Sequence, residues 1–163
     1  WHYQTTPGER WDYTATQHMI LADLQLGDKT EKVLMQAPKN GFFYVLNRET
    51  GKLISAEPFV TVNWASHIDL ETGRPVFDTD VSNYEHQGKL TFPAGYGGHN
   101  WHPMSYSPVT GLVYLPTQDV PMVYEQDPGF ADRKMAIVAG VKFPEMTDEE
   151  VAGVPKLVGY RKN

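Results

Sequence analysis

The sequence predicts an all-β protein built from repeated antiparallel hairpins, and three observations support this class. Strand-favouring aromatic residues are abundant, with 4 Trp, 9 Tyr and 7 Phe among 163 residues. Turn-forming residues are frequent as well, with 14 Gly and 12 Pro. Short apolar runs alternate with these turn residues, which is the spacing of an antiparallel meander. A recurrent turn motif favours a propeller or a barrel over a sandwich.

Strand candidates follow one another through the first half of the chain. The run MILADLQL (19–26) precedes the turn GDKTEK, and KVLMQAP (32–38) follows it. The stretch PKNG leads into GFFYVLN (41–47), and Asn-Gly between two apolar runs is typical of a hairpin turn. The remaining candidates are 52–60, 62–70 and the strand, turn and strand of 105–119.

A Thr-Gly pair recurs at three of the predicted turns. The segments NRETGKLI (47–54), DLETGRPV (69–76) and SPVTGLVY (107–114) each place this pair between strand-like residues. The Asn, Asp or Ser before the pair can accept a backbone N–H, and the Gly can adopt a positive φ. The spacing between the segments is irregular, so we expect inserted loops, above all at 78–103.

The C-terminal segment follows a different pattern. Thr147 and Glu150 have the spacing of a capping box, which predicts a short helix that Gly153 and Pro155 end within about two turns. We interpret 128–163 as a loop excursion within a single domain, not as a second domain.

Composition and charge argue against several classes of protein. With 40% hydrophobic and 21% charged residues, the chain is expected to fold. Its net charge of −6 and the lack of a basic stripe argue against a nucleic-acid partner. No apolar run approaches the ~20 residues of a transmembrane segment, and the absence of Cys excludes a disulfide within this stretch. Because the sequence opens on Trp1 with no leader, we expect an internal piece of a longer protein.

The tripeptide Trp11-Asp12-Tyr13 places one carboxylate between two large rings. Such a group is expected to be half desolvated, which leaves two interpretations. Asp12 could act as a general base that faces a substrate hydroxyl. Alternatively, its oxygens could accept backbone N–H groups near Thr14 and Thr16, and composition alone favours this second interpretation.

Two further stretches could carry chemistry. Lys39, in the PKNG hairpin, could donate to an anionic or carbonyl oxygen, or it could simply be solvated. The stretch AGYGGHNWHPMSY (94–106) offers glycines for close backbone approach and a Trp for stacking. For His99 and His102 we predict hydrogen-bonded loop residues rather than metal ligands, because Gly and Pro argue against a helix there. For Asn100 and Trp101 the ligand-binding and structural roles both stay open.

Taken in order, several motifs of this chain resemble those of the pyrroloquinoline quinone (PQQ)-dependent alcohol dehydrogenases. The motifs are W-H-Y-Q-T-T-P with W-D-Y, then APKNGFFYVLNRETGKLISA, VNWAS and GGHNWHPMSYSPVTGLVYLP. The likeness is greater to the quinohaemoprotein branch than to the methanol dehydrogenases, and it runs from Trp1 to about Tyr124. Several long motifs in register are more specific than one short motif.

The resemblance implies a fold and the roles of four residues. The fold is a partial eight-bladed β-propeller, with about three blades in this chain. The Asp of the family's W-D-Y motif is the catalytic base and falls on Asp12. The basic residue of the hairpin contacts the quinone and falls on Lys39, and the Asn-Trp pair that lines the cofactor pocket falls on Asn100 and Trp101.

The resemblance also implies a reaction and its cofactors. Primary alcohols are oxidised to aldehydes by hydride transfer to PQQ, with Ca²⁺ as a Lewis acid. Lanthanide-using relatives carry a second Asp two positions after the base, where this chain has Thr14, so Ca²⁺ is expected. Asp12 would lie close to the ion as a candidate ligand, while the main Glu and Asn ligands and any haem c domain are expected outside this chain. A cytochrome or quinone electron acceptor and a periplasmic location follow from the resemblance alone.

Two alternatives compete with this interpretation. A PQQ-dependent sugar or polyol dehydrogenase would share the cofactor and differ in substrate. A non-catalytic propeller, used for binding or as a scaffold, would also carry Thr-Gly turns, but it has no need for the four site residues together. In each case the chain alone is expected to be inactive, because blades bury their faces against neighbouring blades.

Overall fold

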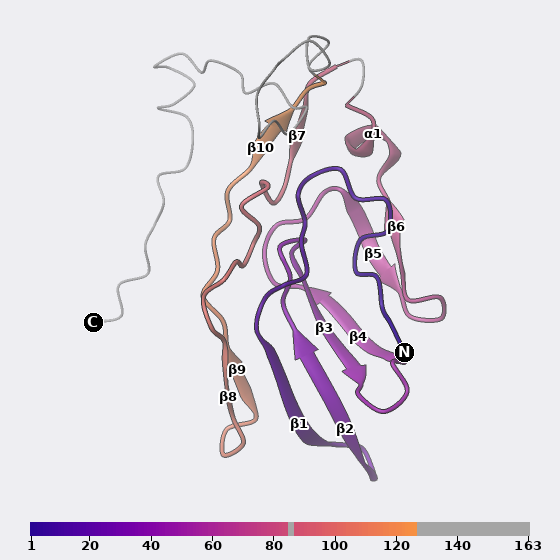
Figure 1. The fold of residues 1–163 in the computed structure, drawn as a ribbon, viewed down its shortest axis with the longest axis vertical. Coiled ribbons are helices and arrows are strands. Elements are labelled where there is room, and N and C mark those ends of the chain that lie inside the picture. Colours follow the sequence, from indigo (N-terminus) through magenta and orange to yellow (C-terminus); the bar gives the residue numbers. More distant parts are fainter. Residues whose placement is uncertain (85–86, 127–163) are drawn as a thin grey trace, which may run out of the picture.

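The structure is a computed structural model that describes residues 1–84 and 87–126 (Figure 1). The helix predicted from Thr147 and the loop excursion at 128–163 lie outside the described residues. Within the described part, every element is a strand except the four-residue helix α1 (Thr79–Ser82). The all-β prediction is therefore confirmed. None of the described residues forms a helix long and apolar enough to cross a membrane.

The largest element is a four-stranded antiparallel sheet in sequence order, as a meander requires (Figure 1). Its strands are β1 (Met19–Leu26), β2 (Lys29–Gln36), β3 (Phe42–Asn47) and β4 (Leu53–Pro58). β1 has the predicted bounds. β2 begins earlier than its apolar run predicts, because Leu26 pairs with Lys29 and leaves only Gly27 and Asp28 for the turn. Gly27 accommodates this tight turn with a φ of +62°.

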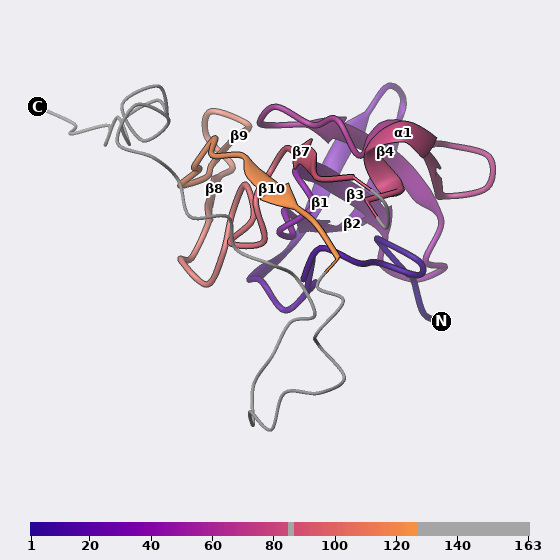
Figure 2. The same cartoon turned by 90° about the horizontal axis from the view of Figure 1, so that it is seen from above.

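Three two-stranded antiparallel sheets complete the described fold. They pair β5 (Ala65–Asp69) with β6 (Arg74–Phe77), β7 (Lys89–Thr91) with β10 (Met122–Tyr124), and β8 (Ser105–Ser107) with β9 (Leu112–Tyr114). Figures 1 and 2 show the β7–β10 pair above one end of the four-stranded sheet. The sequence did not predict this pair, because three-residue strands carry no readable alternation and the partners lie far apart in the chain.

Each predicted Thr-Gly turn joins two paired strands, so the three turn predictions are confirmed. The side chains of Asn47, Asp69 and Ser107 each accept the backbone N–H of the Thr three residues later. The Gly that follows each Thr has a φ of +69° to +76°. The side-chain acceptor and the glycine are the two features that the motif supplies to the turn.

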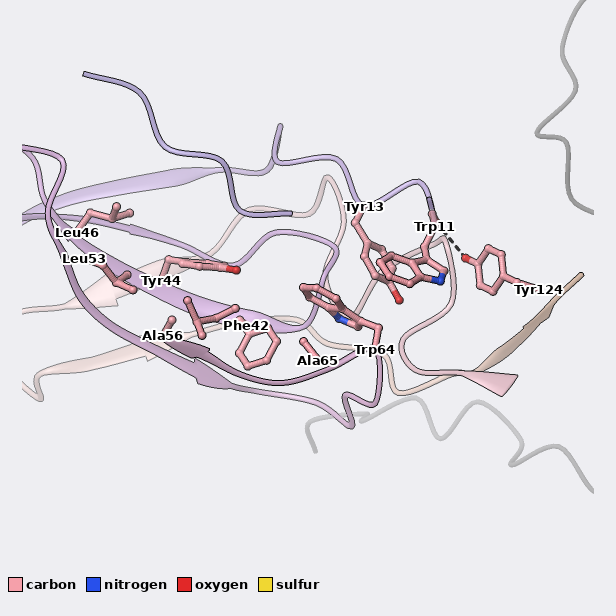
Figure 3. Packing of buried hydrophobic residues seen from close by; sticks show 11 residues of the cluster. Trp11, Tyr13, Phe42, Tyr44, Leu46, Leu53, Ala56, Trp64, Ala65 and Tyr124 are labelled. Atoms are coloured by element: carbon pink, nitrogen blue, oxygen red, sulfur yellow. Dashed lines mark hydrogen bonds between the residues drawn. The ribbon is translucent and has the colours of Figure 1, made fainter. Parts of the chain in front are cut away.

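The core is largely aromatic, and it ties the N-terminal segment to the sheets (Figure 3). Trp11, Tyr13 and Trp64 pack against one another with ring centroids 5.4–5.7 Å apart. Phe42 meets Trp64 edge to face at 5.8 Å. Pairs of this kind contribute about 0.5–1.5 kcal/mol each beyond the burial of area. Because the residues on both sides of position 12 are core residues, the core fixes where the Asp12 backbone lies.

Candidate functional site

Asp12 lies on the segment before β1, at the edge of the aromatic core. Trp11 and Tyr13 are each only 2% exposed, whereas the Asp12 side chain is 70% exposed. The expectation of a half-desolvated acid between two rings is therefore wrong for the described chain. The backbone explains the difference: Asp12 has a φ of +67°, and its side chain is directed out of the core while both neighbouring rings enter it.

The acceptor of backbone N–H groups in this segment is Glu9, not Asp12. Glu9 Oε2 accepts the N–H of Trp11 at 3.0 Å and the N–H of Tyr13 at 2.8 Å. The interpretation of Asp12 as a turn residue that satisfies nearby N–H groups is therefore wrong. Sequence reasoning missed Glu9, although a carboxylate two and four residues before those N–H groups has the spacing for local side-chain-to-backbone bonds.

Two buried phenols fix the carbonyl groups around Asp12. Tyr124 donates to the carbonyl of Trp11 at 2.9 Å, as the dashed line in Figure 3 marks, and Tyr13 donates to the carbonyl of Pro93. Burial raises the pKa of both phenols far above the ordinary value, and the Asp12 and Glu9 carboxylates raise that of Tyr124 further. Both groups therefore stay protonated and continue to donate these bonds at alkaline pH, where an exposed phenol would ionise.

Lys39 binds the Asp12 carboxylate directly, with 2.8 Å between Nζ and Oδ2. The structure thus brings together two predicted site residues that are 27 positions apart. The Lys39 side chain is only 11% exposed, so the interpretation of a solvated lysine at the hairpin tip is wrong. A buried stem limits the positions that the ammonium can reach, and this directs it at the carboxylate.

The connection between β2 and β3 is buried because Asn40 anchors it. Asn40 is fully buried, donates to Thr6 Oγ1 at 3.1 Å and to Tyr44 Oη at 2.9 Å, and accepts the N–H of Phe42 at 3.1 Å. Its carbonyl accepts Trp64 Nε1–H at 2.8 Å. β2 and β3 pair as the predicted hairpin, and these bonds bury the connection between them and hold Lys39 at the core.

The glycine-rich loop of 94–98 packs onto Lys39. The N–H of Gly98 donates to the Lys39 carbonyl at 2.9 Å, and Gln118 Nε2 donates to the Gly97 carbonyl at 2.9 Å. Gly97 has a φ of +83°, and a Cβ there would lie 2.5 Å from Lys39 Cγ and 2.6 Å from its Cα. Within the described chain, the backbone at Gly97 therefore lies close to the lysine stem, and the close approach to a ligand stays a prediction.

Asn100 and Trp101 follow this loop. Asn100 Nδ2 donates to the Tyr96 carbonyl at 2.8 Å, and Trp101 is 77% exposed with its ring stacked on His102 at 4.1 Å. Among the described residues no hydrogen bond, ion pair or ring contact joins either of them to the Asp12–Lys39 pair. His99 is buried, and its two ring nitrogens lie 2.6 Å from the carbonyls of Ala37 and His102, which confirms the predicted hydrogen-bonded histidine.

The family model described as "Glucose/ethanol/alcohol dehydrogenase, beta-propeller domain" matches residues 1–63. The quinohemoprotein alcohol dehydrogenase ADH IIB of Pseudomonas putida is 54% identical over 155 residues, which are 94% of this chain and 22% of that protein. The 1-butanol dehydrogenase (cytochrome c) of Thauera butanivorans is 53% identical over 127 residues, 78% of this chain and 18% of that protein.

The fold agrees with these sequence matches. The solved structure of the quinohemoprotein alcohol dehydrogenase ADHIIG from Pseudomonas putida HK5 superposes with a TM-score of 0.80 at 49% identity. The superposition covers 87% of this chain and 22% of that structure, so the chain spans about a fifth of the length of the relatives it matches. The chain belongs to the family of PQQ-dependent alcohol dehydrogenases and forms part of their β-propeller fold.

Proposed function

We propose that this chain supplies the general base and the cofactor contacts of an enzyme that oxidises primary alcohols to aldehydes with PQQ. The observation that carries the proposal is the Asp12–Lys39 pair: an exposed carboxylate held at 2.8 Å by an ammonium with a buried stem. An ordinary surface ion pair needs neither a left-handed backbone at the acid nor a buried lysine. Both features direct the carboxylate oxygens to a defined position.

The residues present fit the cofactor that we propose. An ammonium has three N–H groups, so Lys39 can bind Asp12 and still donate to quinone oxygens. Ca²⁺ takes six to eight oxygen ligands, and Asp12 can supply a carboxylate oxygen. Within residues 1–84 and 87–126 no group of three or more acidic or His side chains is close enough together to hold an ion. Further ligands would therefore have to come from other parts of the complete protein.

Each of the four residues has a proposed role. Bound PQQ would supply the acceptor for the hydride of the carbinol carbon, and bound Ca²⁺ would supply a Lewis acid at the quinone. Asp12 removes the hydroxyl proton in step with hydride loss, which makes a carboxylate sufficient although an alcohol is a very weak acid. Lys39 orients Asp12 and stabilises negative charge on the quinone oxygens. Asn100 and Trp101 line the cofactor pocket, and the exposed Trp101 ring offers a stacking face.

The electron acceptor and the location are parts of the same proposal. One relative is named 1-butanol dehydrogenase (cytochrome c) and another alcohol dehydrogenase (quinone), so a cytochrome or a quinone is the proposed acceptor. The name quinohemoprotein alcohol dehydrogenase supports a haem c domain elsewhere in the protein. We place the enzyme in the periplasm, as implied by the family resemblance. A sugar or polyol substrate would use the same base and cofactor, so comparison of alcohol and polyol turnover separates the two substrate classes.

The proposed base is tested by Asp12→Asn in the complete protein. We expect PQQ to stay bound while kcat falls about 10²- to 10⁴-fold, the range that a general base contributes. Asp23→Asn is a matched control, because Asp23 is also exposed and pairs with Arg48 at 3.1 Å on the β-sheet. Turnover of Asp12→Asn close to that of the control would refute the role of Asp12 and favour a non-catalytic propeller.

The role of Lys39 is tested by Lys39→Met, which keeps much of the buried stem and removes the charge. We expect weaker PQQ binding or slower cofactor reduction, measured from the absorbance of the bound quinone. Lys32→Met is the control, because Lys32 forms an exposed ion pair with Glu49 at 2.6 Å. Unchanged PQQ affinity together with an unchanged rate would remove Lys39 from the site.

A further inference from the structure

Asp12 has a backbone conformation that needs support from its surroundings. Its φ of +67° lies in the left-handed region, and no other non-glycine residue of the described chain has a positive φ. Such a conformation costs free energy and persists only where neighbouring contacts over-determine it. The contacts that hold residues 11–14 therefore decide where the Asp12 carboxylate points.

Glu9 supplies such contacts on both sides of Asp12. The same oxygen, Oε2, binds the N–H of residue 11 at 3.0 Å and that of residue 13 at 2.8 Å. Hydrogen bonds to a charged acceptor are stronger than bonds between neutral groups. One oxygen that gathers the N–H groups of positions 11 and 13 bends the backbone between them, and Asp12 lies at that bend.

The other hydrogen bonds of this segment each act on one side only. Tyr124 holds the Trp11 carbonyl at 2.9 Å, and the N–H of Thr14 donates to the Asp12 carbonyl at 3.0 Å. Among the hydrogen bonds of the described residues, those of Glu9 alone bracket Asp12. Loss of Glu9 would leave two N–H groups at the core edge to find other acceptors, and the left-handed conformation would then depend on the packing of Trp11 and Tyr13 and on bonds that act on one side only.

We propose that Glu9 is a positioning residue for the reaction: it fixes the bend that directs the Asp12 carboxylate at Lys39 and at the alcohol hydroxyl. The proposal rests on the proposed function, because it requires Asp12 to be the base. Glu9 acts through the backbone and transfers no proton itself. Its removal should therefore affect turnover only while Asp12 can still act as a base.

A double-mutant cycle in the complete, PQQ-loaded protein tests this dependence. Glu9→Ala should lower kcat roughly 10- to 100-fold, as expected of a base misplaced by about 1 Å, with KM and PQQ content unchanged. In the Asp12→Asn background, Glu9→Ala should change the residual kcat by less than about twofold. Glu9→Gln keeps an acceptor oxygen, so it should retain kcat within about threefold. Glu49→Ala is the control, because Glu49 is exposed and binds Lys32.

Crystal structures of the PQQ-free protein give a readout that does not depend on activity. In Glu9→Ala we expect Asp12 to leave the positive-φ region and its Oδ2 to lie more than 3.5 Å from Lys39 Nζ, against 2.8 Å with Glu9 present. Unchanged Asp12 geometry in Glu9→Ala would overturn the role of Glu9. The role would also be overturned if Glu9→Ala lowered kcat by the same factor in the Asp12→Asn background as in the unsubstituted protein. If Glu9→Ala does not fold, the crystal structure of the unsubstituted protein provides the test. The role of Glu9 would be overturned if Oε2 lay beyond hydrogen-bond distance of the N–H groups of both residue 11 and residue 13.

These results separate the two proposals. Asp12→Asn with near-normal turnover would refute the proposed function, whatever Glu9 does. An inactive Asp12→Asn combined with a Glu9→Ala variant within about twofold of the unsubstituted kcat would refute the positioning role alone.

Discussion

Substitution of Gly97 by Ala should separate Lys39 from Asp12 although neither of these two residues is replaced. The added Cβ would lie 2.5 Å from Lys39 Cγ, and an ordinary contact begins at 3.4 Å, so about 0.9 Å must be gained by movement. The contact also includes Lys39 Cα at 2.6 Å, so the backbone has to move and not only a flexible side chain. If the shift reaches the ammonium, the Nζ–Oδ2 distance of 2.8 Å grows beyond hydrogen-bond range.

The expected loss follows from this displacement. A misplacement of about 1 Å at a catalytic group can reduce turnover about 10²-fold, so we expect kcat of Gly97→Ala to fall roughly 10- to 100-fold. The substitution also adds about 1 kcal/mol of strain at a φ of +83° and about 1–3 kcal/mol of overpacking. Initial rates at saturating alcohol and the absorbance of bound PQQ, measured on the complete protein, give the two readouts.

Gly27→Ala is the matched control. Gly27 has a φ of +62° and nothing lies within 4 Å of its Cβ position, so this variant carries the backbone strain without the contact. We expect its kcat to stay close to that of the unsubstituted protein. Equal turnover of Gly97→Ala and Gly27→Ala would refute the reasoning, because it would mean that the loop does not set the position of Lys39.

Three further predictions concern the hydrogen bond of Tyr124, the turn at Asp69 and the exposed ring of Trp101. Tyr124→Phe leaves the buried carbonyl of Trp11 without its donor, so we expect a loss of about 1–3 kcal/mol, measured as a lower apparent Tm. The Thr72 hydroxyl, and then its N–H, lower the pKa of Asp69 below 3.8, so the stability that Asp69 contributes is present above that value and is lost as the pH falls through the lowered pKa. Thr72→Ala should raise this pKa in an NMR titration, and an unchanged pKa would contradict the assigned cause. Trp101→Ala should weaken PQQ binding and leave Tm unchanged, because the ring is 77% exposed; a clear loss of Tm would show a structural role instead.

Local patterns in the sequence predicted most of the sheet. The alternation of 19–26 gave the bounds of β1, and each Thr-Gly motif led to a hairpin, because side-chain acceptor and glycine act within a few residues. The pairing of β7 with β10 was out of reach, because it joins three-residue strands across a long stretch of chain. Register of that kind is set by the packing around it and not by the residues in the strand.

The candidate site also depends on contacts between residues far apart in the chain, which the sequence does not predict. Composition alone favours Asp12 as an acceptor of nearby N–H groups and allows a solvated Lys39, and the structure contradicts both interpretations. Burial of Lys39 depends on Gly97 and on the anchor of Asn40, and neither contact is local to the lysine. The family resemblance assigned Asp12 and Lys39 to one site. Glu9 lies outside the family motifs, and its only sign in the sequence is its spacing from the N–H groups of residues 11 and 13.

The central claim is that the Asp12 carboxylate faces an alcohol beside a bound quinone, with Lys39 between acid and cofactor. A crystal structure of the complete protein with PQQ and an alcohol tests it most directly. We predict an Asp12 carboxylate oxygen within about 3.2 Å of the alcohol hydroxyl and Lys39 Nζ within hydrogen-bond distance of both Asp12 and a quinone oxygen. An Asp12 carboxylate on the outer surface, remote from the quinone, would contradict the account.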